Sequence, residues 1–143
     1  MTNDTAGVRT FVIADIRGYS RYTEECGDEA AAALTKRFSQ IVNDDADSYD
    51  GELVEMRGDE ALVVFTSARQ AIRAAVDLQA QFQEAAVEFQ IPLRVGIGID
   101  SGTTTSGYSW ATKNWRNGCP WRMAARRRKS YHRSSCSMLA RRA

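Results

Sequence analysis

The stretch FVIADIRGYS, residues 11–20, joins a short apolar run to a carboxylate and a glycine turn. Its β-branched residues, with those just before it, predict a buried strand over residues 8–16. Gly18 marks the turn, and a helix is expected to begin at about Tyr19. Asp15 would then stand at a strand end, where a carboxylate suits a hard cation and free helical N–H groups suit phosphate. The alternative is an aspartate that only caps the helix or shapes the turn.

Helices and strands follow in a regular order. The spacing of Leu34, Phe38, Ile41 and Val42 gives one apolar face to a helix within residues 19–49, which we expect to be interrupted near residues 27–28. The later strands are expected at residues 52–56, 61–65 and 93–99. A helix capped by Ser67 is expected before the strand at 93–99, and a turn is expected after it, at residues 100–102. This order predicts an α+β fold, an α/β sandwich with helices packed on a sheet.

A second carboxylate, Asp59, lies in the hairpin-length connection between two expected strands. If this hairpin and the first strand share a sheet, Asp15 and Asp59 can lie side by side. Two close carboxylates repel each other unless a cation bridges them. A pair of metals there could activate a ribose 3′-hydroxyl and steady a triphosphate. The alternative is a turn aspartate on a solvated hairpin.

Charge divides the chain into two unlike parts. Residues 1–107 hold all 18 acidic residues against 9 Lys and Arg, a net charge of −9, whereas residues 108–143 hold 10 Lys and Arg and no acid. We expect a polar disordered N-terminus over residues 1–7, one domain over residues 8–102, and a divergent basic tail rich in Trp, Arg and Ser over residues 103–143. The tail is either a genuine segment or the product of a shifted reading frame.

Targeting and redox signals favour a cytoplasmic protein without a membrane partner. The first seven residues lack the apolar run of a secretory signal. No stretch approaches the ~18 consecutive apolar residues of a membrane span. The chain has three cysteines, Cys26, Cys119 and Cys136, which is a small and odd number, and a disulfide framework needs several pairs.

Three segments taken together resemble the class III adenylyl/guanylyl cyclase catalytic domain. They are FVIADIRGYS at residues 11–20, GELVEMRGDEALVVF at 51–65 and LRVGIGIDSG at 93–102. The resemblance covers about residues 8–102, roughly the first half to two-thirds of such a domain. It implies the ferredoxin-like cyclase fold in the order βααββαβ, with the C-terminal strands missing or divergent. Diguanylate cyclases share a Gly-Asp-Glu hairpin, but Arg57 stands where their motif has another Gly.

The resemblance also implies a role for each matching position. Asp15, Asp59 and the backbone carbonyl of Ile16 would hold two Mg²⁺ or Mn²⁺ ions per site. The segment that would wrap the triphosphate consists of Arg17, Gly18, Tyr19 and Ser20. Glu55 matches the residue that reads the purine base, where adenylyl cyclases usually have Lys and guanylyl cyclases Glu. A carboxylate accepts hydrogen bonds from N1–H and the 2-amino group of guanine. The alternative for Glu55 is a solvated strand residue.

The tail departs from the family pattern. The family has a helix with an Asn and, four residues on, an Arg, which stabilise the ribose and the charge that develops on phosphate. Arg126 could stand for that Arg and is the catalytic candidate by position, but Arg122 occupies the place of the Asn. Neither Asn114 nor Asn117 has an Arg four residues on.

Two other features of the tail have alternative interpretations. Cys119, His132 and Cys136 could offer three zinc ligands, but a structural site needs four. The basic residues 126–129 could bind a polyanion electrostatically, although we expect no nucleic-acid partner.

The expected function is that of a class III nucleotide cyclase-like protein in cyclic nucleotide signalling. Its reaction would convert a nucleoside triphosphate, ATP or GTP, into the 3′,5′-cyclic monophosphate and pyrophosphate. Family sites form across a dimer interface, so the implied partner is a second copy or an intact cyclase. Without a convincing Asn–Arg pair, we expect a truncated protein that is weakly active or inactive alone. The alternative is a non-catalytic cyclase-like dimerisation or regulatory module with a basic tail.

Overall fold

The computed structural model describes residues 7–88, 90 and 94–104. In chain order the elements are β1 (Gly7–Arg17), α1 (Tyr19–Cys26), α2 (Asp28–Ser48), β2 (Glu52–Arg57), β3 (Glu60–Phe65), α3 (Ala68–Glu88) and β4 (Arg94–Thr104). The predicted βααββαβ order is therefore confirmed. The catalytic candidate Arg126 and the three possible zinc ligands lie outside the described residues, so the prediction that the C-terminal strands of the family are missing or divergent also falls outside them.

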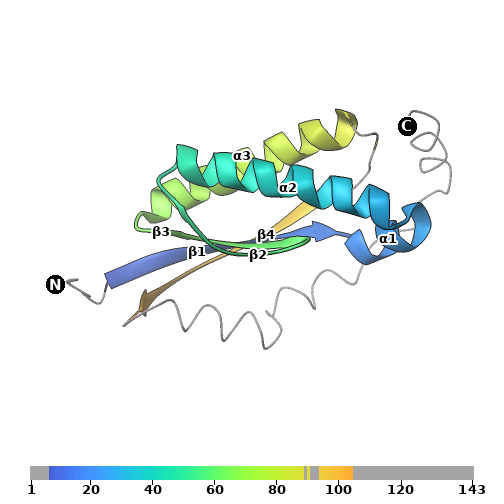
Figure 1. The fold of residues 1–143 in the computed structure, drawn as a ribbon. Coiled ribbons are helices and arrows are strands. Elements are labelled where there is room, and N and C mark those ends of the chain that lie inside the picture. Colours follow the sequence, from blue (N-terminus) through green and yellow to red (C-terminus); the bar gives the residue numbers. More distant parts are fainter. Residues whose placement is uncertain (1–6, 89, 91–93, 105–143) are drawn as a thin grey trace.

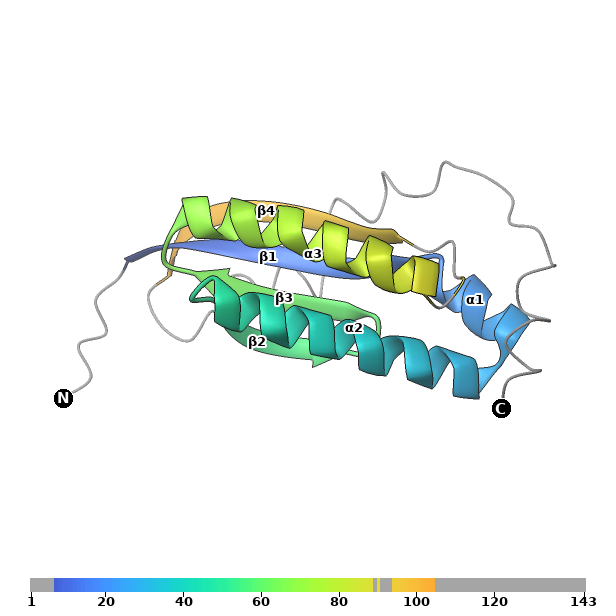
Figure 2. The same cartoon turned by 90° about the horizontal axis from the view of Figure 1, so that it is seen from above.

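The strands form one antiparallel sheet with helices on a single face. The strand order is β2-β3-β1-β4, so β1 and β3 are central and β4 lies at an edge of the described sheet. Figure 1 shows α2 and α3 on the same side of the sheet. Seen from above in Figure 2, α3 lies over β1 and β4, and α2 lies over β3 and β2. This arrangement confirms the predicted α+β class.

Side chains of β1 alternate between the two faces of the sheet. Val12, Ala14 and Ile16 are buried in the cluster that the helices cover. Phe11 and Ile13 belong to a smaller apolar cluster on the opposite side, which we call the second face. The near-continuous apolar sequence of β1 is thus explained by burial on both sides. Continuing the alternation places the next two odd-numbered side chains, 15 and 17, on the second face.

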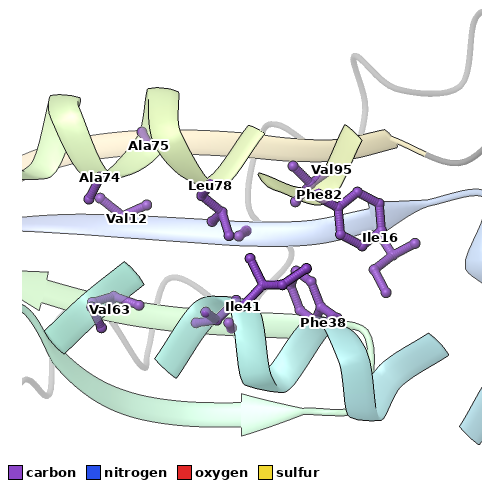
Figure 3. Packing of buried hydrophobic residues seen from close by; sticks show 14 of the residues in the cluster. Val12, Ile16, Phe38, Ile41, Val63, Ala74, Ala75, Leu78, Phe82 and Val95 are labelled. Atoms are coloured by element: carbon purple, nitrogen blue, oxygen red, sulfur yellow. The ribbon is translucent and has the colours of Figure 1, made fainter. Parts of the chain in front are cut away.

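The main core lies between the sheet and the two long helices (Figure 3). The predicted apolar face of α2 is confirmed, and Phe38 is fully buried there. Its ring meets the ring of Phe82 from α3 edge to face, with centroids 5.8 Å apart. On α3, Ala71, Ala74 and Ala75 are buried against the sheet, and such small side chains let a helix approach closely.

The expected turn at residues 100–102 is wrong, because β4 continues to Thr104. The first half of β1 pairs with this extension, from Phe11 opposite Asp100 to Gly7 opposite Thr104. The hydroxyl groups of Thr10 and Ser101 also lie 2.9 Å apart across the two strands. Long-range strand pairing therefore overrides a local Asp-Ser-Gly turn signal, which sequence spacing cannot reveal.

Two further observations concern Cys26 and the helices. Cys26, the last residue of α1, is disulfide-bonded, which the cysteine count did not lead us to expect. Within residues 7–88, 90 and 94–104, no helix is both long and apolar enough to cross a membrane.

Candidate functional site

The end of β1 meets the β2–β3 hairpin in the sheet. The backbone N–H of Ile16 donates to the carbonyl of Asp59 over 2.9 Å. In the strand register, Asp15 stands opposite Glu60, the first residue of β3. Antiparallel pairing of two central strands therefore brings together the chain segments that carry the two predicted metal-binding aspartates. Metal binding by these side chains stays a prediction.

A row of four positions crosses the second face at this end of the sheet. It runs from Arg57 on β2 to Glu60 on β3, Asp15 on β1 and Gly96 on β4. Glu60 is only 9% exposed, and a buried carboxylate needs a partner or a cation. Glu60 was not among the residues predicted from the sequence. Its position one residue after the hairpin Asp, as the first residue of an apolar strand, is the signal that could have indicated it.

Arg17 and Asp15 form an ion pair within β1. The Nε of Arg17 lies 3.2 Å from Oδ1 of Asp15, with side chains 34% and 24% exposed. The two residues are two apart in one strand and so share the second face. The predicted triphosphate-binding arginine is therefore already paired with a predicted metal ligand.

Gly18 turns the chain from β1 into α1. Its φ of 80° and ψ of 14° are left-handed values that glycine adopts without strain. Its carbonyl accepts the first bond of the helix, from the N–H of Tyr22 over 3.0 Å. Among the described residues, no side chain caps this N-terminus by a hydrogen bond, and its first turn has no acid. Its N–H groups and dipole would favour an anion.

The other two predicted triphosphate residues begin α1. Ser20 is exposed, whereas Tyr19 is partly buried and packs against the main core. Because the Tyr19 ring contacts the core, its contribution to anion binding would come from its backbone N–H. Ser20 can offer both its backbone N–H and its hydroxyl.

Glu55 stands on β2, opposite Leu62 of β3, after an irregularity in the pairing of these strands. Leu62 belongs to the apolar cluster of the second face, so Glu55 shares that face with Asp15. Its carboxylate forms an ion pair with Arg57, two residues along the same strand. A guanine base would have to compete with that arginine for the carboxylate.

The donor set suits a hard divalent cation. Within the described part of the chain, no three or more His, Cys, Asp or Glu side chains gather as a metal site. The predicted set is of another kind, since it combines Asp15 and Asp59 with the backbone carbonyl of Ile16. All three are oxygen donors, which Mg²⁺ prefers, and strand pairing joins the segments that carry them.

No protein-family model and no curated protein matches the sequence. Solved structures do match the fold. The adenylyl cyclase CyaB from P. aeruginosa is 22% identical with a TM-score of 0.65, and the match covers 70% of this chain and 58% of that one. A bacterial light-regulated adenylyl cyclase is 25% identical with a TM-score of 0.63, over 69% and 31% of the two chains.

A guanylyl cyclase structure matches equally well. The guanylate cyclase domain of RhGC from Catenaria anguillulae, in complex with GTP, is 18% identical with a TM-score of 0.65, over 71% of this chain and 60% of that one. This chain thus spans less than two thirds of each of these three structures. Adenylyl and guanylyl cyclase structures are about equally similar to this chain in fold. The described part of this chain has the fold of the class III adenylyl/guanylyl cyclase catalytic domain.

Proposed function

We propose that this chain is a class III nucleotide cyclase-like protein that is weakly active or inactive alone. It would bind ATP or GTP with Mg²⁺ or Mn²⁺ and act in cyclic nucleotide signalling. The observation that carries the proposal is the hydrogen bond from Ile16 N–H to the Asp59 carbonyl, in a sheet with the fold of cyclase domains. It joins the two chain segments on which the predicted metal ligands stand.

The roles of the residues follow from their chemistry. Asp15, Asp59 and the Ile16 carbonyl would hold two divalent ions, which lower the pKa of a ribose 3′-hydroxyl and neutralise triphosphate charge. The start of α1 would bind triphosphate oxygens through the backbone N–H groups of Tyr19 and Ser20. Arg17 would add positive charge beside them.

Glu55 would read the base in the site whose two aspartates come from the partner chain, because the resemblance implies that the base reader and the metal aspartates of one site stand on different protomers. Its carboxylate can accept two hydrogen bonds from guanine, whereas adenine offers no matching pair of donors on that edge. This favours GTP over ATP, provided that guanine displaces Arg57 from the carboxylate.

The charge stabilisers would come from a partner chain. Removing one preorganised donor from a site typically costs about 10²–10³ in rate, and this sequence has no credible Asn–Arg pair. A dimer of this chain should therefore be nearly silent. A heterodimer with an intact cyclase could form one working site, to which this chain supplies Asp15 and Asp59.

The test is complementation. A class III cyclase in which only the two metal-binding aspartates have been substituted is mixed with this chain, GTP or ATP, and Mn²⁺. We expect cyclic nucleotide from the mixture and almost none from either protein alone. The matched control is this chain with Asp15→Asn, which should restore nothing, beside Asp28→Asn, an exposed aspartate at the start of α2.

Two results would contradict the proposal. Turnover by this chain alone at an ordinary cyclase rate, lost in Asp15→Asn, would show a complete enzyme. A stable heterodimer without any product would favour the alternative, a non-catalytic dimerisation or regulatory module.

A further inference from the structure

The guanidinium of Arg17 lies over the backbone of the edge strand. Gly96 on β4 stands opposite Asp15 in the register, on the second face. A Cβ atom built on Gly96 would overlap Nε, Cζ and Nη2 of Arg17. Gly96 therefore leaves the space that the arginine head group occupies. Any other residue there would force the head group to move.

That position also brings Arg17 to its carboxylate. From above Gly96, its Nε reaches Oδ1 of Asp15 at 3.2 Å. A guanidinium in contact with a carboxylate fills part of the space that a bound cation would need. It also already compensates the negative charge that would attract that cation. Arg17 and a divalent metal would then compete for Asp15.

We infer that Arg17 is an internal cation that pairs with Asp15 until a divalent metal replaces it. Gly96 leaves the space in which its guanidinium lies. This inference rests on the proposed function, because it assumes that Asp15 is a metal ligand. Arg17 directly precedes Gly18, the residue that leads into α1, so a displaced guanidinium would lie near the proposed triphosphate site. Metal entry would thereby make Arg17 available to the phosphates.

The sharpest variant changes no charge. Gly96→Ala introduces only a Cβ, and the atoms it meets belong to the flexible end of Arg17, which can move away at little cost. Such a partly exposed ion pair contributes up to about 1 kcal/mol, so its loss should tighten binding of Mn²⁺ by up to about fivefold. Arg17→Gln removes the competitor and its charge together and should tighten binding at least as much.

The experiment measures binding of Mn²⁺ alone to the full chain by calorimetry. Arg21→Gln is the matched control, because Arg21 is an exposed arginine paired with Glu25 on α1 and loses the same charge. Gly98→Ala is the control for the added methyl, since Gly98 lies on the same face of β4 opposite Ile13. Both controls should bind Mn²⁺ like the unmodified chain. Thermal melting confirms that each variant folds.

The outcomes separate this inference from the proposed function. Tighter Mn²⁺ binding in Gly96→Ala and Arg17→Gln, lost on adding Asp15→Asn, supports the displaced-arginine scheme. Binding that needs Asp15 but is unchanged in both variants overturns the scheme and leaves the metal site standing. An absence of Mn²⁺ binding in every chain, including Arg17→Gln, overturns the metal site and the scheme with it.

Discussion

Asp45 should make the stability of this domain fall as the pH rises towards neutrality. It lies on α2 and is only 4% exposed. Its Oδ1 atom is buried and has no hydrogen-bond partner among the described residues. Across the helix interface, Asp77 of α3 accepts hydrogen bonds from Tyr49 Oη at 3.3 Å and from Gln81 Nε2 at 3.0 Å. Asp45 is therefore a buried acid beside a second, well-satisfied carboxylate.

The magnitude follows from the two states of the Asp45 carboxyl. Burial raises its pKa from the ordinary value of 3.8 to about 7, and the Asp77 carboxylate adds to the rise. Between these values the folded chain binds a proton that the unfolded chain has lost. The free energy of unfolding therefore decreases with rising pH in this window, by about 1.4 kcal/mol per pH unit. The whole loss is of order 4 kcal/mol, complete above about pH 7.

The perturbation is Asp45→Asn, which keeps the shape of the side chain and removes its charge. We expect the variant to resemble the unmodified protein near pH 4 and to be more stable at pH 8, by about 2 kcal/mol or more. Urea unfolding from pH 4 to 8.5 measures both curves, and their difference cancels the other titrating groups. Asp47→Asn is the control, because Asp47 is exposed on the same helix. Parallel curves for the Asp45 variant and the unmodified chain would refute the argument.

Three further changes test the core and the site. Phe38→Ala should lower the free energy of unfolding by about 3–5 kcal/mol, because it removes the ring contact with Phe82 and leaves a cavity. Urea unfolding measures the loss, with Gln40→Ala at an exposed position of the same helix as the control. Gly18→Ala should cost about 1–2 kcal/mol, because its left-handed φ strains any side chain, and equal stability would contradict this. Asp59→Asn should weaken Mn²⁺ binding at least about tenfold, by loss of a charged ligand. Calorimetry tests that loss, with Asp50→Asn at an exposed position as the control, and unchanged affinity in the Asp59 variant would exclude Asp59 as a ligand.

Local patterns predicted most of the fold. The apolar spacing in α2 and the run from residue 61 to residue 65 leave little choice of element type. Gly27 ends α1 where the helix was expected to break. The extension of β4 was missed, because Asp100 to Gly102 forms a turn by local preference and a strand only when paired with β1. Pairing between residues about 90 positions apart has no local signature.

The site was predicted unevenly for a related reason. Asp15 and Asp59 were singled out because carboxylates at strand ends and hairpins stand out in a sequence, and Glu55 because it matches a position of the cyclase family that the sequence resembles. Glu60 and Gly96 were missed, because their relevance comes from standing opposite Asp15 in two different neighbouring strands. Register places them beside Asp15, and register depends on the whole sheet.

The two predicted acids on the second face share an arrangement that follows from strand geometry alone. Asp15 is paired with Arg17 and Glu55 with Arg57, each two residues on in the same strand. Because side chains two apart point to the same face, an Asp-x-Arg or Glu-x-Arg sequence in a strand places a cation beside its own acid. Without ligands these pairs reduce the repulsion between acids that share one face. Any metal or guanine base that binds there must replace an arginine, so affinity at both positions reports a difference between two partners rather than the strength of one contact.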